Sequence, residues 1–293
     1  MKKFLFHDPK LLIYGFLIIF FASYGQTFFV ALFNDDIKSY YSLSDGQFGL
    51  LYALATTLSS LLIINFAKMI DYIDLRIYSL LITLGLLVPC FAIYFLPSNI
   101  IFLFIIIFTL RFFGQGAMNH AGITSMTRYF GKNRGKAISV GNLGGMIGVM
   151  FLPFFIVYLS DFFSFKQIWL FCGLSLLFFL PILFFLLNNQ FERQEKFKNS
   201  LIEENKQWKT REVIKNKNFL IYLPIASAFS FIGTGLMFHQ IFIFTQKGWT
   251  IEMLGTGFIF LGGFSIIGLI FGGPLIDILN PRKAILFILT PIF

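Results

Sequence analysis

One arginine inside an otherwise uncharged apolar run is the clearest candidate for chemistry in this chain. Arg111 interrupts residues 100–127, a run long enough to cross the roughly 30 Å hydrocarbon core of a bilayer. At about 1.5 Å of rise per residue, Arg111 lies near the midplane, where its side chain reaches water at neither surface. A charge at that depth costs about 2.5–3.5 kcal/mol on insertion scales, so it is retained where it faces a cavity or a partner.

Two further polar residues follow Arg111 at intervals of four. Gln115 and Asn119 would share its helix face and form a polar stripe toward the interior of a helical bundle. In one interpretation Arg111 binds an anion or takes part in proton coupling. In the other it is a packing residue bonded to neighbouring backbone carbonyls, and the sequence leaves both open.

The first apolar run carries a second polar face. At helical spacing its polar members fall within a narrow arc; they are Ser23, Gln26, Thr27 and Asn34. Such a face lines a substrate path or bonds to a neighbouring helix, and both alternatives stay open. Tyr52 in the second run is a weaker candidate of the same kind. The substrate-binding candidates are therefore Arg111, Gln115, Asn119, Gln26, Thr27 and Tyr52.

A short pattern occurs twice, each time in the turn after an apolar run. Asp71 precedes Arg76 at the same spacing at which Asp277 precedes Arg282, and a small residue stands four positions before each aspartate. A parallel duplication of two helical halves would produce this repeat. The charges can pair with each other or with helix ends, and ordinary topology-setting charge is the plainer alternative.

These turns resemble those of the major facilitator superfamily, whose two six-helix halves carry a Gly-x-x-x-Asp-(Arg)-x-x-x-Arg motif there. The stretches 110–116, with Arg111 and Gly114, and 129–137 are also similar to the family pattern. Tyr72 replaces the usual arginine, and the Gly-Pro pair typical of drug/proton antiporters is missing, which disfavours a drug exporter. The resemblance implies a secondary transporter in which Asp71, Arg76, Asp277 and Arg282 latch one conformation.

Composition places the whole chain in a membrane. It is 57% hydrophobic and 13% charged, with 43 phenylalanines among 293 residues, far more apolar surface than one soluble core could bury. Eight runs are long enough to span the bilayer. They are residues 11–33, 47–67, 77–96, 100–127, 137–160, 167–190, 218–246 and 253–276.

Basic residues predict the orientation. Most of the 23 Lys and Arg residues fall in connections on the same side as the N-terminus, whereas Lys38, Lys166 and Lys247 fall on the other. The positive-inside rule then puts the N-terminus in the cytoplasm, and we expect a multi-pass protein of the cell inner (plasma) membrane. The net charge of +9 is distributed along these connections, which suits lipid headgroups rather than nucleic acid.

We predict an all-α integral membrane fold with eight full spans and part of a ninth. Residues 1–190 form an N-terminal six-helix half, 191–217 a charged cytoplasmic linker, and 218–293 the start of a C-terminal half. The linker is expected to be a solvated connector or a surface helix. A ninth apolar run begins at residue 284 and stops at 293, so we expect the N-terminal two-thirds of a longer protein.

Glycines predict close helix packing in the fifth run. Gly141 with Gly145, and Gly144 with Gly148, form two overlapping small-xxx-small pairs. Such pairs let the backbone of a neighbouring helix approach closely.

The predicted function is secondary active transport of a small solute, with an organic anion favoured because a guanidinium pairs well with planar oxyanions. Proton or sodium coupling, as in a symporter, is expected, because no nucleotide-binding motif is found. No cofactor or metal site is predicted, and His120 and His239 are expected to be packing residues. A membrane-embedded enzyme and a non-functional transporter fragment are the alternatives.

Overall fold

Helices are the regular elements of the computed structural model, which describes residues 8–201 and 210–278. The predicted all-helical class is confirmed over these residues. The first group of helices is α2 (Pro9–Ala22), α3 (Thr27–Val30), α4 (Asn34–Tyr41), α5 (Asp45–Phe66), α6 (Leu75–Phe95), α7 (Ile100–Thr109), α8 (Asn119–Tyr129), α9 (Arg134–Ser160) and α10 (Phe165–Leu186). The second group is α11 (Gln190–Leu201), α12 (Thr210–Ile214), α13 (Lys217–Phe238), α14 (Gln240–Gln246) and α15 (Ile251–Ile278).

The number of membrane spans is smaller than predicted within the described residues. Six helices are long and apolar enough to cross a membrane, and a seventh span results if the bent pair Pro9–Gly25 and Thr27–Tyr41 is one crossing. The seventh predicted span corresponds to α13, which is not among these candidates, and to α14, which follows a break at His239. The partial ninth span, which was predicted from residue 284, lies outside the described residues. The count of eight full spans stays a prediction.

Side chains before several helices explain where those helices begin. Ser44 and Ser164 each form a capping box with the glutamine three residues later, at the starts of α5 and α10. These reciprocal bonds satisfy backbone donors that have no partner within the helix. Asp74 and Asn99 accept backbone hydrogen bonds at the starts of α6 and α7. The spans therefore begin at polar caps in the short turns between apolar runs.

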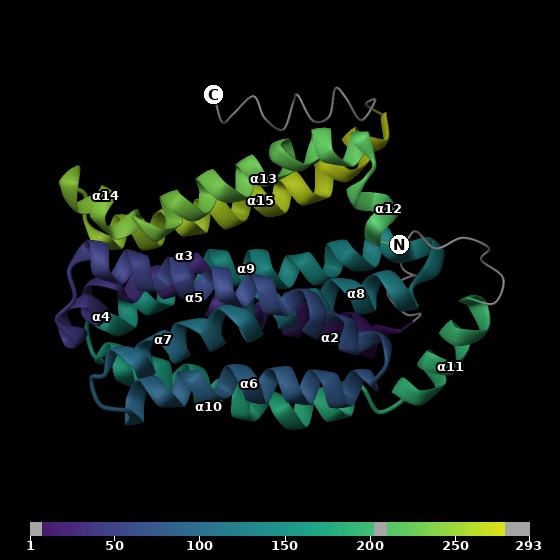
Figure 1. The fold of residues 1–293 in the computed structure, drawn as a ribbon, viewed down its shortest axis with the longest axis horizontal. Helices are drawn as coiled ribbons and strands as arrows, with labels where there is room; N and C mark the ends of the chain where they lie inside the picture. Colours follow the sequence, from purple (N-terminus) through teal and green to yellow (C-terminus); the bar gives the residue numbers. More distant parts are fainter. Residues whose placement is uncertain (1–7, 202–209, 279–293) are drawn as a thin grey trace.

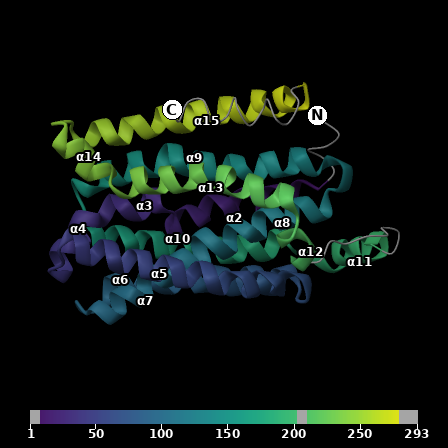
Figure 2. The same cartoon turned by 45° about the horizontal axis from the view of Figure 1, so that its top comes forward.

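Figure 1 shows how these helices are arranged. Helices α2 to α10 form a bundle, α15 packs along α9 of this bundle, and α13 contacts α3, as Figures 1 and 2 show from two directions. Helices α4 and α14 lie at one end of the molecule, which we call the α4 end, and α11 lies at the opposite end, which we call the α11 end. The long axes of the helices run between these two ends.

The predicted glycine packing in the fifth run is confirmed. A methyl group at Gly144 would lie 2.8 Å from the carbonyl carbon of Phe16 in α2 and closer still to its oxygen. A methyl group at Gly141 or Gly145 would lie 3.1 Å from the side chain of Ile19. Small residues on α9 thus allow it to pack directly on the backbone of α2.

The predicted linker contains two helices, α11 and α12. Arg193 of α11 donates two hydrogen bonds to Asp8, of 2.6 and 2.8 Å, and Asp8 also caps the start of α2. Gln190 donates to the hydroxyl of Tyr129 at 2.8 Å. The surface-helix interpretation therefore fits α11, which is tied to the bundle, while the domain limits at 190 and 217 stay predictions.

Gly144→Ala should destabilise the protein by about 1–3 kcal/mol, because the added methyl group meets backbone atoms that cannot rotate away. Unfolding in mixed detergent micelles measures this difference. Gly257→Ala in α15 is the matched control, since a methyl group there meets no atom within 4 Å. Equal stability of the two variants would contradict the packing of α9 on α2.

Candidate functional site

Arg111 lies in a π-helical segment, Leu110–Met118, that joins α7 to α8 within one continuous span. Its side chain is 2% exposed. A π-helix bonds residue i to residue i+5, is rare, and often marks a functional site. Sequence reasoning assumed ordinary helical spacing here and missed it, because no residue type identifies a π-helix by itself.

A break in the first span provides the hydrogen-bond partner of Arg111. Nη1 of Arg111 donates to the carbonyl oxygen of Gly25 at 3.0 Å. Gly25 ends a short 3-10 turn, Ser23–Gly25, and Gln26 after it has extended backbone angles of −79° and 151°. The two parts of the span meet at 47°. Carbonyls at a helix end lack helical donors, so the break leaves one available to the buried guanidinium.

Glycine is required where these two spans cross. A methyl group at Gly25 would lie 2.7 Å from the Cα atom of Gly114 and closer still to the carbonyl oxygen of Leu110. A methyl group at Gly114 would lie 2.7 Å from the Cα atom of Gly25. The close approach brings the backbone of the first span within reach of Arg111.

Tyr52 and Thr27 complete what we call the Arg111 cluster, which consists of Arg111, Gly25, Thr27 and Tyr52. The guanidinium carbon lies 5.4 Å from the centre of the Tyr52 ring, a cation–π distance. The hydroxyl of Tyr52 donates to Thr27 Oγ1 at 3.2 Å. Within the described residues no carboxylate forms an ion pair with Arg111, and its Nε has no hydrogen-bond partner.

This geometry bears on both interpretations of Arg111. The bond to Gly25 is the carbonyl contact that the packing interpretation predicts. The guanidinium has further N–H donors, and the Nε without a partner in the described residues is one that an anion could use. Arg111 is therefore held by the first span, and its role in binding a solute stays a prediction.

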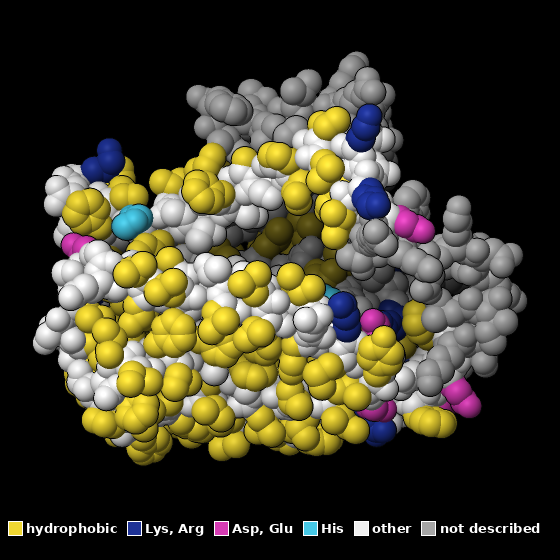
Figure 3. All heavy atoms as spheres, viewed as in Figure 1, with side chains coloured by type: hydrophobic (Ala, Val, Ile, Leu, Met, Phe, Trp, Pro, Cys, Tyr) yellow, Lys and Arg dark blue, Asp and Glu magenta, His cyan; other side chains and the backbone are white. Residues whose placement is uncertain are grey.

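A cavity of about 310 Å³, with apolar and polar residues in its wall, lies between the bundle and α15. Figure 3 shows the surface hollowed between the bundle and the helices that lie along it. Polar groups from four spans face this cavity. It is lined by Ile19, Ser23, Gln26, Phe28, Asn119, Asn142, Gly145, Met146, Val149 and Ser265.

The structure separates the predicted site residues into two places. Gln26 and Asn119 line the cavity, whereas Arg111, Thr27 and Tyr52 form the cluster behind Gly25. The break explains the separation, because the polar residues of the first span no longer share one helix face. The single polar face predicted for the first span is therefore wrong.

The predicted stripe of Arg111, Gln115 and Asn119 is also divided. Gln115 is half-buried, and within the described chain its side chain hydrogen-bonds to neither the cavity residues nor the cluster. Asn119 lines the cavity, whereas Arg111 bonds to Gly25 and does not line it.

Two cavity residues were missed by sequence reasoning. Asn142 lies on α9 and Ser265 on α15, each a polar residue in an apolar span. That contrast was visible in the sequence, but Asn142 stands among small packing glycines and Ser265 has no polar neighbour at helical spacing. Ser265 also donates to the carbonyl of Leu261 in its own helix at 2.7 Å, so nothing local distinguished it from a residue that bonds only within its helix.

The predicted gating residues Asp71 and Arg76 pair with other residues and not with each other. Asp71 forms an ion pair with Arg128 at the end of α8, and Arg128 also donates to the carbonyl of Ile70 at 3.0 Å. Arg76 pairs with Asp74 at 3.2 Å, so a pair between Asp71 and Arg76 is not formed. The Asp74 carboxylate also caps the start of α6, which explains why it holds Arg76 locally.

The second copy of this pattern lies at and beyond the end of the described residues. Asp277 lies near the end of α15 in a stretch whose side chains are not described, and Arg282 lies outside the described residues. Their predicted gating role stays a prediction.

Several apolar spans with a cavity between the bundle and α15 define a multi-pass membrane protein, and such a cavity is typical of solute transporters. The family model described as Major Facilitator Superfamily matches residues 15–293. The chain therefore belongs to the major facilitator superfamily, a family of membrane transporters that are generally not enzymes. No curated protein and no solved structure matches it.

A double-mutant cycle should detect coupling of about 0.2–1 kcal/mol between Asp71 and Arg128, the range measured for partly exposed ion pairs. The substitutions are Asp71→Asn and Arg128→Gln, and unfolding in mixed micelles gives the four free energies. The same cycle with Arg76→Gln is the control and should show no coupling to Asp71. Coupling of Asp71 to Arg76 alone would contradict the pairing described.

Proposed function

We propose that the protein is a secondary active transporter that moves a small solute through the cavity between the bundle and α15. The observation that carries this proposal is the cavity itself, whose wall includes amide side chains from the broken first span, α8 and α9, together with Ser265 of α15. A site shared between the two helical groups can be exposed to either side of a membrane if the groups rock against each other.

The cavity wall suggests how a solute would be held. The polar groups that line it are the amides of Gln26, Asn119 and Asn142 and the hydroxyls of Ser23 and Ser265. Amides both donate and accept hydrogen bonds, so they can hold solute oxygens and N–H groups alike. A polar solute with several hydrogen-bonding groups fits this wall.

Arg111 has a separate role in this proposal. It positions Gln26 by holding the carbonyl of the preceding residue, Gly25, at the break. A small organic anion is a second candidate for the solute. Two observations favour it: in the described chain Arg111 has no carboxylate partner, and its Nε has no hydrogen-bond acceptor. Such an anion would have to reach the guanidinium past Gly25, because Arg111 does not line the cavity.

The setting in the membrane is also a proposal. Basic residues concentrate in the connections on the side of the N-terminus, which favours a cytoplasmic N-terminus in the cell inner membrane. Coupling to protons or sodium ions supplies the driving force in this account.

Uptake of labelled carboxylates, amino acids and sugars by proteoliposomes, with and without a proton or sodium gradient, tests the function. For the solute that accumulates, Asn119→Ala or Asn142→Ala should lower uptake efficiency about 2- to 10-fold, the value of one hydrogen bond. Asn218→Ala, which removes an exposed amide at the start of α13, is the matched control and should have no effect. Normal uptake by both cavity variants would contradict the proposed site.

Arg111→Gln separates the two roles of the arginine in the same assay. A positioning residue should be needed for whichever solute is carried, charged or neutral, whereas an anion ligand should be needed for anions alone. Normal transport of an anion by Arg111→Gln would end the anion-site hypothesis.

A further inference from the structure

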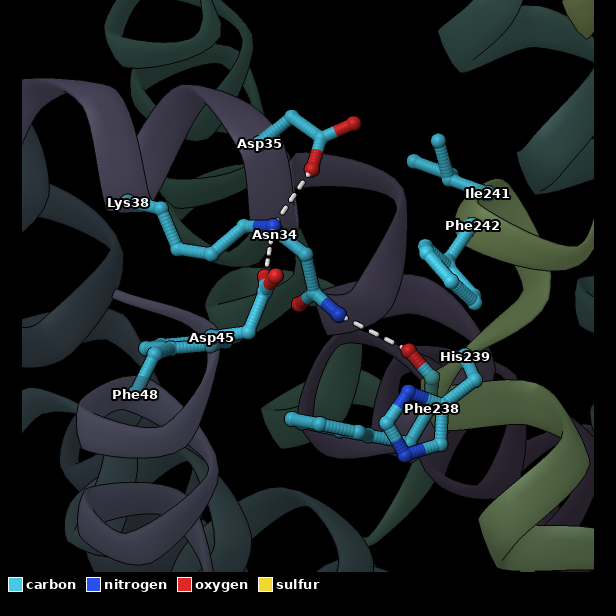
Figure 4. Close-up of a pocket in the computed structure, with 9 residues that line it drawn as sticks. All are labelled: Asn34, Asp35, Lys38, Asp45, Phe48, Phe238, His239, Ile241 and Phe242. Carbon is cyan, nitrogen blue, oxygen red and sulfur yellow. Dashed lines mark hydrogen bonds and ion pairs between the residues drawn. The ribbon is translucent and has the colours of Figure 1, made fainter. Parts of the chain in front are cut away.

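At the α4 end, two amide side chains form hydrogen bonds between the bundle and a second helical group, which consists of α13, α14 and α15. Nδ2 of Asn34 donates to the carbonyl oxygen of Phe238 at 2.8 Å, a bond drawn in Figure 4. Nε2 of Gln240 donates in the other direction, to the carbonyl oxygen of Phe28 at 3.0 Å. Each amide thus reaches backbone that belongs to the opposite group.

Both acceptors lie at breaks in a span. Phe238 is the last residue of α13, directly before the break at His239, and Gln240 is the first residue of α14. Phe28 lies in the four-residue helix α3, directly after the break at Gly25 and Gln26. Carbonyls in the last turn of a helix lack helical donors, so these are available to side chains from elsewhere.

Aromatic packing accompanies the two hydrogen bonds. The ring of Phe238 stacks on Phe48 with centres 5.8 Å apart and lies 4.7 Å from the ring of Tyr52. The ring of Phe28 lies 6.0 Å from Phe258 of α15. These apolar contacts join the same two helical groups, so the α4 end is closed in this conformation.

An ion-pair network lies on the side that carries Asn34. Lys38 of α4 pairs with Asp35 at 2.8 Å and with Asp45, at the start of α5, at 2.5 Å. Figure 4 shows these pairs beside Asn34, around a small cavity of about 160 Å³. The network lies wholly within the bundle, so it holds α4 in place without joining the two groups.

Within the described residues, no other side-chain hydrogen bond joins the bundle to α13, α14 or α15 than those of Asn34 and Gln240. The oxygens of both amides have no hydrogen-bond donor in the described chain. The desolvation penalty of a buried acceptor without a donor offsets part of the stabilisation from the two hydrogen bonds. The net stabilisation of the closed α4 end by these two hydrogen bonds is therefore small.

We infer that Asn34 and Gln240 form a reciprocal latch that holds the α4 end closed and is released each time that end opens. The inference rests on the proposed function, because only a transporter with alternating access needs this end to open. The two breaks allow the tips of the first span and of α13–α14 to move apart. Each tip carries one donor and one acceptor, so both bonds are lost together.

Double electron–electron resonance in liposomes tests the latch without any solute. Spin labels at Ser39→Cys and Gln246→Cys report the separation of the two tips, since both positions are exposed and the native Cys90 and Cys172 are buried. Asn34→Ala or Gln240→Ala should each raise the ratio of long to short distances about 2- to 10-fold, the value of one hydrogen bond. The double variant should raise it by about the product of the two.

Isosteric variants separate the loss of the hydrogen bond from the change in side-chain volume that alanine introduces. Asn34→Asp and Gln240→Glu keep the size but replace the donor by an acceptor, so at pH 8 they should shift the ratio further than alanine does. Asn218→Ala should leave the distribution unchanged, as should a label pair at Ser39→Cys and Asp161→Cys, both within the bundle.

An unchanged Ser39–Gln246 distribution in folded alanine and isosteric variants would overturn the latch. That result is distinct from failure of the proposed function, which is judged by solute uptake. Shifted distances in the variants of a protein that takes up none of the tested solutes would support the contact that closes the α4 end and leave the transport proposal without support.

Discussion

The burial of one guanidinium in the middle of a membrane span is the constraint on which the N-terminal bundle depends. Arg111 is 2% exposed, and its partner is a backbone carbonyl of the first span at 3.0 Å. A guanidinium held there needs hydrogen-bond acceptors that a continuous helix does not offer. The break after Gly25 frees the carbonyl, and the pair of glycines at positions 25 and 114 lets the two backbones approach. The break that satisfies Arg111 also directs Gln26 into the cavity.

The same contacts connect the midplane with the α4 end. Arg111 lies over the ring of Tyr52, Tyr52 donates to Thr27, and the ring of Tyr52 packs on Phe238 of the opposite helical group. Phe238 supplies the carbonyl that Asn34 binds. A movement of the first span at its break would therefore displace side chains that pack directly against Phe238 at the α4 end. The breaks at Gly25 and at His239 are the places where such movement needs the fewest helical hydrogen bonds to change.

Sequence reasoning could predict what depends on residue type and length, and not what depends on tertiary approach. The apolar runs and the significance of the isolated charge at Arg111 follow from the cost of placing polar groups in lipid, and the small residues around Gly144 indicate close helix packing. The π-helical segment and the break at Gly25 lie in contact although they are far apart in the chain, and no local pattern identified them. For the same reason Asp71 could be assigned to a charged turn, but its partner Arg128 could not be chosen over Arg76. Asn142 and Ser265 became recognisable as cavity residues only when α9 and α15 were placed side by side.

The central claim is that Arg111 is held by the backbone of the first span while solute occupies the separate polar cavity. Solid-state NMR in lipid tests it most directly, with ¹⁵N in the arginine guanidinium groups and ¹³C in the glycine carbonyls. The account predicts a dipolar coupling between Arg111 and the carbonyl carbon of Gly25, lost in Arg111→Lys and retained when a transported solute is added. A coupling that is missing in the wild type, or that disappears when solute binds, would contradict the account and favour a direct contact between Arg111 and the solute.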